Sequence, residues 1–360
     1  MKNAISRRSF VGLIGASLGT TLLSACAGAG TNAGDASSTS TPAAAIDYMV
    51  LVNPKHKVPD DWEERLDLVE EKSLLYNDPV RVDRKAYEAW KSMKEELAAE
   101  GVFVELDSCY RSKAEQQEVM DDFTKKYGAE YAKQIVAEPG TSEHQTGLAL
   151  DLFLVIDGVQ VAENEEMMKH PEVWEKVHAK LADHGFILRY PRRKAIFTEC
   201  TYEPWHMRYI DDPKTAHEIM DADTTFEQYL GMESAYVKDC KVDYGTPSRY
   251  TDYAIDSTVD AILREFESWD GCHMTRFAYA GDDACGDDEL AYVNELRASK
   301  EPDLEEFGQA IVMVTDFRSP SAEKVKGTAW EPDTDYNDYT WHLGRKDDDD
   351  EWHLMGWGYA

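Results

Sequence analysis

Two short segments contain the residue types that hydrolytic chemistry requires. The first places His144 in a loop and Asp151 inside the apolar strand that follows. A carboxylate within an apolar strand costs several kcal/mol unless a partner such as a metal ion neutralises it. The second segment, Glu-Pro-Trp-His, contains Glu203 and His206, which are three residues apart and can face one point. We therefore take these four side chains together as a candidate site.

Three of the four side chains match the donors of a catalytic zinc site. Two imidazoles and one carboxylate, from His144, His206 and Asp151, give three protein ligands and leave one position open. The remaining carboxylate, Glu203, is then placed to take a proton from the attacking water as a general base. Each residue alone has a commoner explanation, such as a hydrogen-bonded surface histidine. The set as a whole predicts one zinc ion per chain.

The elements that must position these residues follow from hydrophobic periodicity and from helix start and stop signals. The expected helices cover residues 84–100, 112–128 and 171–185, and the expected strands cover residues 102–106, 148–156, 186–190 and 200–210. Strands and helices mix without a regular βαβ rhythm, which predicts an α+β fold with a small mixed sheet and packed helices.

A different pattern follows Pro247. Helices are expected at residues 259–266 and 288–298, and strands at 310–317, 339–343 and 351–357. This pattern predicts a small C-terminal α+β roll, for which an NTF2-like fold is one candidate. The acidic stretch 281–289 lacks the glycine and the spaced ligands of an EF-hand loop, so a solvated loop is favoured over a calcium site.

The N-terminal residues read as an export signal. Arg7 and Arg8 lie in a twin-arginine motif, and a short apolar run ends at Cys26 in a segment that resembles the lipobox of bacterial lipoproteins. A plain secretory signal with an incidental cysteine is the alternative. We expect lipidation of Cys26 and anchoring at the outer face of the cytoplasmic membrane. The expected organisation is a signal at 1–26, a flexible linker at 27–46, a peptidase domain at 47–233 and an accessory domain at 246–360.

The formal net charge of −32 restricts the partners. A chain this acidic cannot replace the counterions condensed on phosphates, which excludes nucleic acid as a ligand. It also repels anionic substrates, so a carboxylate ligand must be held by local cations. The candidates are Arg111 and a basic cluster. The cluster consists of Arg189, Arg192, Arg193 and Lys194, and a solvated basic turn is its commoner explanation.

Five sequence blocks, in order over roughly residues 50–231, resemble the VanY-type D-alanyl-D-alanine carboxypeptidases. The blocks are Leu-Val-Asn at 51–53, Asp-Ser-Cys-Tyr-Arg-Ser at 107–112, Ser-Glu-His-Gln-Thr-Gly-Leu-Ala-Leu-Asp at 142–151, Phe-Ile-Leu-Arg-Tyr-Pro at 186–191 and Tyr-Glu-Pro-Trp-His at 202–206. Any one block is a weak signal, whereas five with family-like gaps are a strong one.

The resemblance implies hydrolysis of the terminal D-Ala-D-Ala bond of peptidoglycan stem peptides. It implies His144, Asp151 and His206 as zinc ligands and Glu203 as the base. It further implies that Arg111 stabilises the developing charge. The substrate contacts that it implies are Ser142, Gln116, Tyr110 and Trp205. A related L,D-carboxypeptidase, a D,D-dipeptidase and a catalytically silent wall-binding lipoprotein remain as alternatives.

The cysteines left after Cys26 permit disulfides in an exported protein. Cys272 and Cys285 are flanked by glycines and close together in the sequence, so we predict a bond between them, with Cys240 as a competing partner. Cys109 and Cys200 depart from the family pattern beside two of its blocks, and a bond between them is possible.

Overall fold

A computed structural model describes residues 45–129, 132, 136–326, 328, 330–348 and 350–359. The expected signal at 1–26 with Cys26, and nearly all of the linker at 27–46, lie outside these residues. Export and lipidation therefore stay predictions, as do the domain boundaries. Within the described ranges, no helix combines the length and the apolar character needed to cross a membrane.

The N-terminal part contains a sheet with strand order β3-β4-β7-β6, and β5 pairs with β4 beside it. The strands are β3 (Val104–Leu106), β4 (Ala149–Ile156), β5 (Val159–Val161), β6 (Phe186–Leu188) and β7 (His206–Tyr209). Two further strands, β1 (Leu68–Glu71) and β2 (Val80–Asp83), form an antiparallel pair. The helices are α1 (Arg84–Ala99), α2 (Lys113–Tyr127), α4 (Asn164–Met167), α5 (Pro171–Leu181), α6 (Ala195–Thr198), α7 (Pro213–Asp221) and α8 (Phe226–Leu230).

Local sequence signals explain where the long helices begin and what they bury. The Asp83 carboxylate accepts hydrogen bonds from the first-turn amides of α1, and Trp90 and Leu97 lie on its buried face. Ser112 and Glu115 form the expected capping box of α2. These predictions are confirmed.

The expected strand at 200–210 is wrong in its first half, because only His206–Tyr209 is extended in the sheet. Pro204 has no amide hydrogen to donate to a ladder. The His206 amide instead donates to the carbonyl of Glu203 at 3.2 Å, which closes a turn immediately before β7. This turn carries the candidate base.

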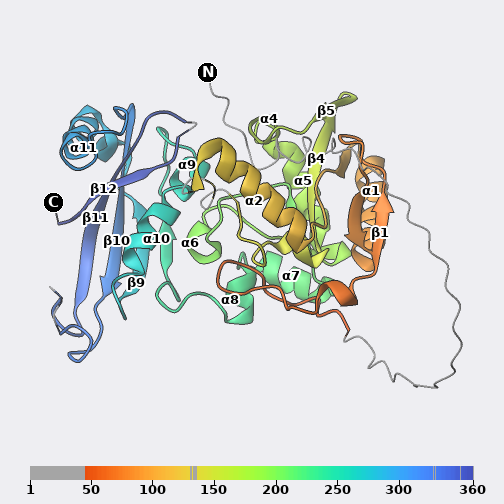
Figure 1. Cartoon of the computed structure of the whole chain (residues 1–360), viewed down its shortest axis with the longest axis horizontal. Helices are drawn as coiled ribbons and strands as arrows, with labels where there is room; N and C mark the ends of the chain where they lie inside the picture. Colours follow the sequence, from red (N-terminus) through yellow and green to blue (C-terminus); the bar gives the residue numbers. More distant parts are fainter. Residues whose placement is uncertain are drawn as a thin grey trace, which may run out of the picture. The chain divides into compact units, whose positions relative to one another are not determined.

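The C-terminal sheet region, residues 241–359, is built on a mixed five-stranded sheet of order β12-β11-β10-β9-β8 (Figure 1). Its strands are β8 (Lys241–Asp243), β9 (His273–Tyr279), β10 (Gln309–Arg318), β11 (Asp335–Arg345) and β12 (His353–Gly358). Neighbouring strands are antiparallel except β8 and β9, which are parallel. Its helices are α9 (Asp252–Asp256), α10 (Val259–Phe266) and α11 (Asp287–Lys300).

The two faces of this sheet pack against different helices. Successive residues of a strand point to opposite faces. Leu354 packs against the cluster that contains α10, whereas Met355 packs in the cluster that contains Val293 of α11. The α+β class is therefore confirmed for this region, and the NTF2-like roll stays a prediction.

The predicted disulfide between Cys272 and Cys285 is wrong, since both residues are buried free thiols. The residues between them include β9, which is extended over His273–Tyr279. A strand of that length separates its ends by roughly 20 Å, whereas a disulfide needs Cα atoms about 6 Å apart. Cys109 and Cys200 are buried and half-buried respectively, and their pairing stays a prediction.

Asp256, at the end of α9, is a buried acid. Its carboxylate accepts a hydrogen bond from the Tyr244 hydroxyl at 2.7 Å and one from the Arg193 amide at 3.3 Å. Burial raises the pKa of Asp256 to about 7, and these hydrogen bonds oppose the rise. The folded protein therefore holds a proton there that the unfolded chain releases at lower pH.

We expect the free energy of unfolding of the wild type to fall as the pH rises from about 4 to about 7, because of Asp256. Between about pH 4 and pH 7 the folded state binds more protons at this group, so its contribution to the free energy of unfolding falls by on the order of 3 kcal/mol. Asp256→Asn should remove this slope, while Asp260→Asn, an exposed control on α10, should keep it. Urea denaturation at several pH values measures the difference. An unchanged slope in Asp256→Asn would contradict the assignment.

Candidate active site

His144 lies in a short 3-10 helix, Glu143–Thr146, which precedes strand β4. Its Nδ1 atom lies 2.7 Å from the backbone carbonyl of Cys109. A carbonyl only accepts, so Nδ1 carries the hydrogen and Nε2 is the nitrogen with the free lone pair in the neutral ring. The chain therefore presents Nε2 of His144 to the site.

Asp151 lies near the start of β4, whose first six residues are all buried. Its side chain is about a tenth exposed, and its amide donates to the Ser108 carbonyl at 2.7 Å. Gly147 separates it from the His144 turn and has a φ of 73°, which only glycine adopts without strain. A Cβ at Gly147 would also lie 3.2 Å from a methyl of Leu68. The turn that separates the two ligands thus requires this glycine.

His206 is the first residue of β7, and Glu203 stands in the turn before it. The side chains of both are buried, and Nδ1 of His206 lies 3.7 Å from Oε2 of Glu203. The Tyr190 ring lies against the His206 imidazole, with 4.8 Å between the centroids. The backbone amide of Glu203 donates to the Tyr190 carbonyl at 3.2 Å.

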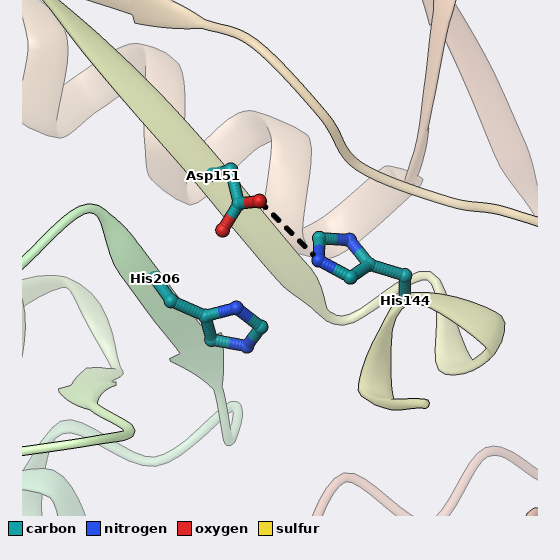
Figure 2. A group of neighbouring side chains, drawn as sticks. All are labelled: His144, Asp151 and His206. Carbon is teal, nitrogen blue, oxygen red and sulfur yellow. Dashed lines mark ion pairs between the residues drawn. The ribbon is translucent and has the colours of Figure 1, made fainter. Parts of the chain in front are cut away.

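The three predicted ligands converge (Figure 2). One donor atom from each of His144, Asp151 and His206 lies within 4.8 Å of the others, and all three residues are buried. Nε2 of His144 is 3.4 Å from Oδ2 of Asp151. Donors at about 2 Å from a tetrahedral zinc ion are about 3.3 Å apart, so this spacing fits. Two imidazoles and a carboxylate are also the donor types that zinc takes in catalytic sites.

Arg111 places a guanidinium beside this group. Its Nη1 donates to Gln116 at 2.7 Å and its Nη2 donates to Ser108 at 3.3 Å, which fixes the plane of the side chain. Its own amide donates to the His144 carbonyl. Burial lowers the pKa of Arg111, and the Asp151 carboxylate is the largest opposing influence. A cation therefore acts directly on the site.

The four expected substrate contacts have different surroundings. Gln116 is buried, and its amide nitrogen donates to the Ala137 carbonyl while its oxygen accepts from Arg111, so its direct contacts hold the guanidinium. Tyr110 packs under the Arg81 guanidinium at 4.9 Å. Ser142 and Trp205 are buried. Their roles toward substrate stay predictions.

Each cation of the basic cluster already contacts a partner within the protein. Arg189 is fully buried and pairs with Glu227 at 2.5 Å. Arg193 pairs with Asp252 and Lys194 with Asp223, each at 3.0 Å. The Arg192 guanidinium lies over the Tyr202 ring. The alternative of a solvated turn is also wrong for Arg189, and Arg111 is the better candidate for binding a substrate carboxylate.

Sequence reasoning missed the support that His178 gives to the Glu-Pro-Trp-His turn. His178 lies on α5, and its Nε2 donates to the Pro204 carbonyl at 2.9 Å. Burial lowers its pKa to about 4, so the ring is neutral at pH 7. Its helical spacing distinguishes it in no way from a core residue, so no sequence signal was available.

A buried His-Asp-His group with a carboxylate beside it defines a metallopeptidase type of centre. Residues 79–212, which contain all of these side chains, match the family model for VanY, D-alanyl-D-alanine carboxypeptidase. The chain belongs to the VanY family.

Known relatives agree with this membership. A D-alanyl-D-alanine carboxypeptidase of Enterococcus faecalis is 30% identical over an alignment of 194 residues that covers 51% of this chain and 66% of that protein. The chain thus spans about two thirds of the length of that relative.

Two solved structures are also similar. A vancomycin resistance D,D-pentapeptidase VanY variant in complex with Zn(II) is 30% identical over 51% of this chain and 98% of its own, with a TM-score of 0.41. The LdcB LD-carboxypeptidase is 31% identical over 51% of this chain and 86% of its own, also with a TM-score of 0.41.

We expect the purified wild type to bind about one zinc ion and Asp151→Asn to bind it far more weakly. Loss of an outer-shell contact costs about 10- to 100-fold in metal affinity, and loss of a ligand should exceed this. Asp157→Asn, in the exposed turn after the same strand, is the matched control. Elemental analysis and chelator competition measure both. Zinc bound by Asp151→Asn with wild-type affinity would rule out this ligand.

Proposed function

We propose that the protein is a zinc-dependent carboxypeptidase that releases D-alanine from peptidoglycan stem peptides ending in D-Ala-D-Ala. The observation that carries the proposal is the convergence of His144, Asp151 and His206 with Glu203 beside them. Membership of the VanY family, through a match that includes all four residues, supports the same substrate class.

The reaction is the addition of water across the terminal peptide bond. Zinc, when bound, polarises the scissile carbonyl and makes water more acidic. Glu203 takes a proton from the attacking water and passes it to the nitrogen of the departing D-alanine. The C–N bond breaks, and the shortened peptide keeps a new carboxylate. Arg111 donates hydrogen bonds to the charge that develops on the carbonyl oxygen or to the terminal carboxylate of the substrate.

Because the chain is strongly acidic, it needs a positively charged side chain fixed in the site to bind an anionic substrate. A net charge of −32 repels a peptide that ends in a free carboxylate. The fixed geometry of Arg111, with Gln116 and Ser108 as acceptors, supports its role as that cation. A guanidinium ordered before substrate arrives loses little side-chain entropy on binding.

The buried Glu203 also favours turnover over a silent wall-binding role, because binding alone needs no base. The choice between a D- and an L-residue before the terminal D-alanine depends on pocket side chains, and LdcB is an L,D-enzyme. Three substrates separate the possibilities. These are a pentapeptide ending in D-Ala-D-Ala, a tetrapeptide ending in an L-residue and D-alanine, and free D-Ala-D-Ala.

We expect Glu203→Gln to lose about 10²- to 10⁴-fold in kcat, as is typical of a missing general base. Zinc should stay bound, because Glu203 is not among the three ligands. The measurement is D-alanine release from the pentapeptide, with and without chelator, beside the zinc content. Glu175→Gln on an exposed position of α5 is the control. Retention of more than about a tenth of the wild-type rate would place the base elsewhere.

Export and anchoring form a separate proposal. Arg7 and Arg8 support passage through the twin-arginine route in the folded state, and Cys26 supports lipid attachment at the outer face of the membrane.

We expect Cys26→Ala to move the protein from the membrane fraction to the soluble fraction, because no acyl chain would be attached. Ser38→Ala in the linker should leave the distribution unchanged. Immunoblots of separated fractions measure this. Persistent membrane retention of Cys26→Ala would mean that something other than the lipid holds the protein.

A further inference from the structure

We propose that the C-terminal sheet region positions the base Glu203 and the ligand His206. It does so through residues 189–200, here called the positioning segment, and Arg193 with Asp252 is the contact that holds this segment. The inference rests on the proposed function where the test measures activity. It rests on the metal site alone where the test measures zinc affinity.

The near end of the positioning segment contacts the site directly. The Arg189 amide donates to the His206 carbonyl at 3.3 Å, and the Tyr190 carbonyl accepts from the Glu203 amide at 3.2 Å. The Tyr190 ring lies against the His206 imidazole. A displacement of these two residues would therefore move both the base and a metal ligand.

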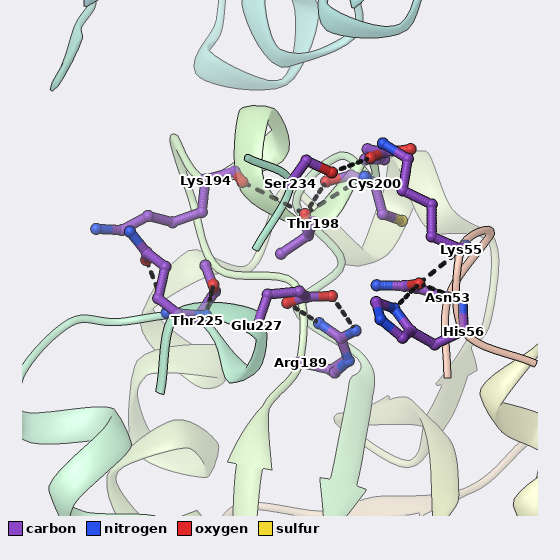
Figure 3. A network of polar contacts seen from close by, with 12 residues as sticks. Asn53, Lys55, His56, Arg189, Lys194, Thr198, Cys200, Thr225, Glu227 and Ser234 are labelled. Carbon is purple, nitrogen blue, oxygen red and sulfur yellow. Dashed lines mark hydrogen bonds and ion pairs between the residues drawn. The ribbon is translucent and has the colours of Figure 1, made fainter. Parts of the chain in front are cut away.

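A buried ion pair holds the side chain of Arg189 in place. Its guanidinium makes two hydrogen bonds to the Glu227 carboxylate, at 2.5 and 3.0 Å, and the two side chains are 0% and 1% exposed (Figure 3). Glu227 lies on α8, which begins with a capping box at Thr225. Breaking such a pair leaves an uncompensated buried charge, so Arg189 has little freedom to adjust on its own.

The far end of the segment belongs to the core of the C-terminal sheet region. Ala195, Ile196 and Phe197 of α6 are buried in the same cluster as Ile262 of α10 and Met313 of β10. Backbone strain occurs on both sides of α6. Arg193 and Glu199 have φ angles of 59° and 54°, which non-glycine residues avoid, so surrounding contacts must hold the segment in place.

Arg193 supplies the most specific of these contacts. Its Nε and Nη2 atoms each lie 3.0 Å from an oxygen of the Asp252 carboxylate, which is a bidentate pair. Its amide donates to Asp256, whose other oxygen accepts from the Tyr244 hydroxyl. Glu199, at the opposite end of α6, accepts from the hydroxyls of Ser234 and Tyr236 at 3.4 and 3.3 Å.

These contacts assign Asp252 a positioning role rather than a catalytic one. Asp252 lies on α9 and acts on the site through Arg193 and the positioning segment. Active sites are sensitive to such support, because a misplacement of about 1 Å can cost roughly 100-fold in rate. The C-terminal sheet region would then be needed for turnover although it contributes no zinc ligand.

The test compares Asp252→Asn, Arg193→Gln and the double variant in the full chain. We expect each to lower kcat about tenfold and to weaken zinc binding by a similar factor, as lost outer-shell support does, with less change in KM. Chelator competition measures zinc affinity without reference to activity. Arg276→Gln is the control, because Arg276 in the same region also makes a partly exposed bidentate pair, with Asp316, and a further hydrogen bond to Asp338, and none of these residues belongs to the positioning segment.

The double variant distinguishes positioning from a direct substrate contact of Arg193. If the pair acts as a unit, the double variant should be no worse than either single variant. A loss of kcat in Arg193→Gln that Asp252→Asn does not share would assign Arg193 to substrate binding and overturn the proposal. So would wild-type kcat and zinc affinity in Asp252→Asn, or equal losses in Arg276→Gln.

Two further outcomes are also decisive. If Asp252→Asn does not fold, Tyr244→Phe removes one hydroxyl from the same cluster and should show the same losses on a smaller scale. Wild-type kcat and zinc affinity in that variant would then overturn the proposal. If the wild type releases no D-alanine, the proposed function fails, while zinc affinity still decides whether the segment positions His206.

Discussion

The free-energy cost of burying the Asp151 carboxylate constrains the arrangement of the residues around it. An ionised acid in an apolar strand is tolerated only with compensating partners. The protein brings two buried histidines to it, one from the turn before its strand and one from the first residue of β7. A metal ion is the partner that satisfies all three donors together. The tight turn at Gly147 and the interruption of the strand at Pro204 allow these side chains to point at one place.

Hydrogen bonds outside the ligand set determine what each group can do. The Cys109 carbonyl selects the His144 tautomer that leaves Nε2 for a metal. Gln116 and Ser108 hold the Arg111 guanidinium, and the neutral His178 holds the carbonyl of Pro204 next to the base. The ligands are thus oriented before any substrate arrives, which lowers the reorganisation needed during reaction. The Tyr190 contacts extend the same support to His206.

The proposed positioning role of the C-terminal sheet region rests on contacts that its sequence did not indicate. Residues of α6, which the sequence places within the peptidase domain, pack in the hydrophobic core of that region. Arg193, interpreted from the sequence as part of a basic turn, forms a bidentate pair with Asp252 of α9. Composition does not record which hydrophobic core a short helix such as α6 enters, so the sequence alone gave no indication of this packing.

The sequence by itself determined which three side chains converge on a candidate metal site, which carboxylate lies beside them, and the helices that precede them. Their residue types at that spacing have few chemical uses, and capping signals at Asp83 and Ser112 act locally. Only the tertiary structure decided the pairings that depend on distant chain segments. Cys272 and Cys285 are near in sequence but lie on either side of an extended strand. Arg189 and Glu227, like His178 and Pro204, meet only because folding brings separate elements together, and their sequence neighbourhoods give no sign of the partner.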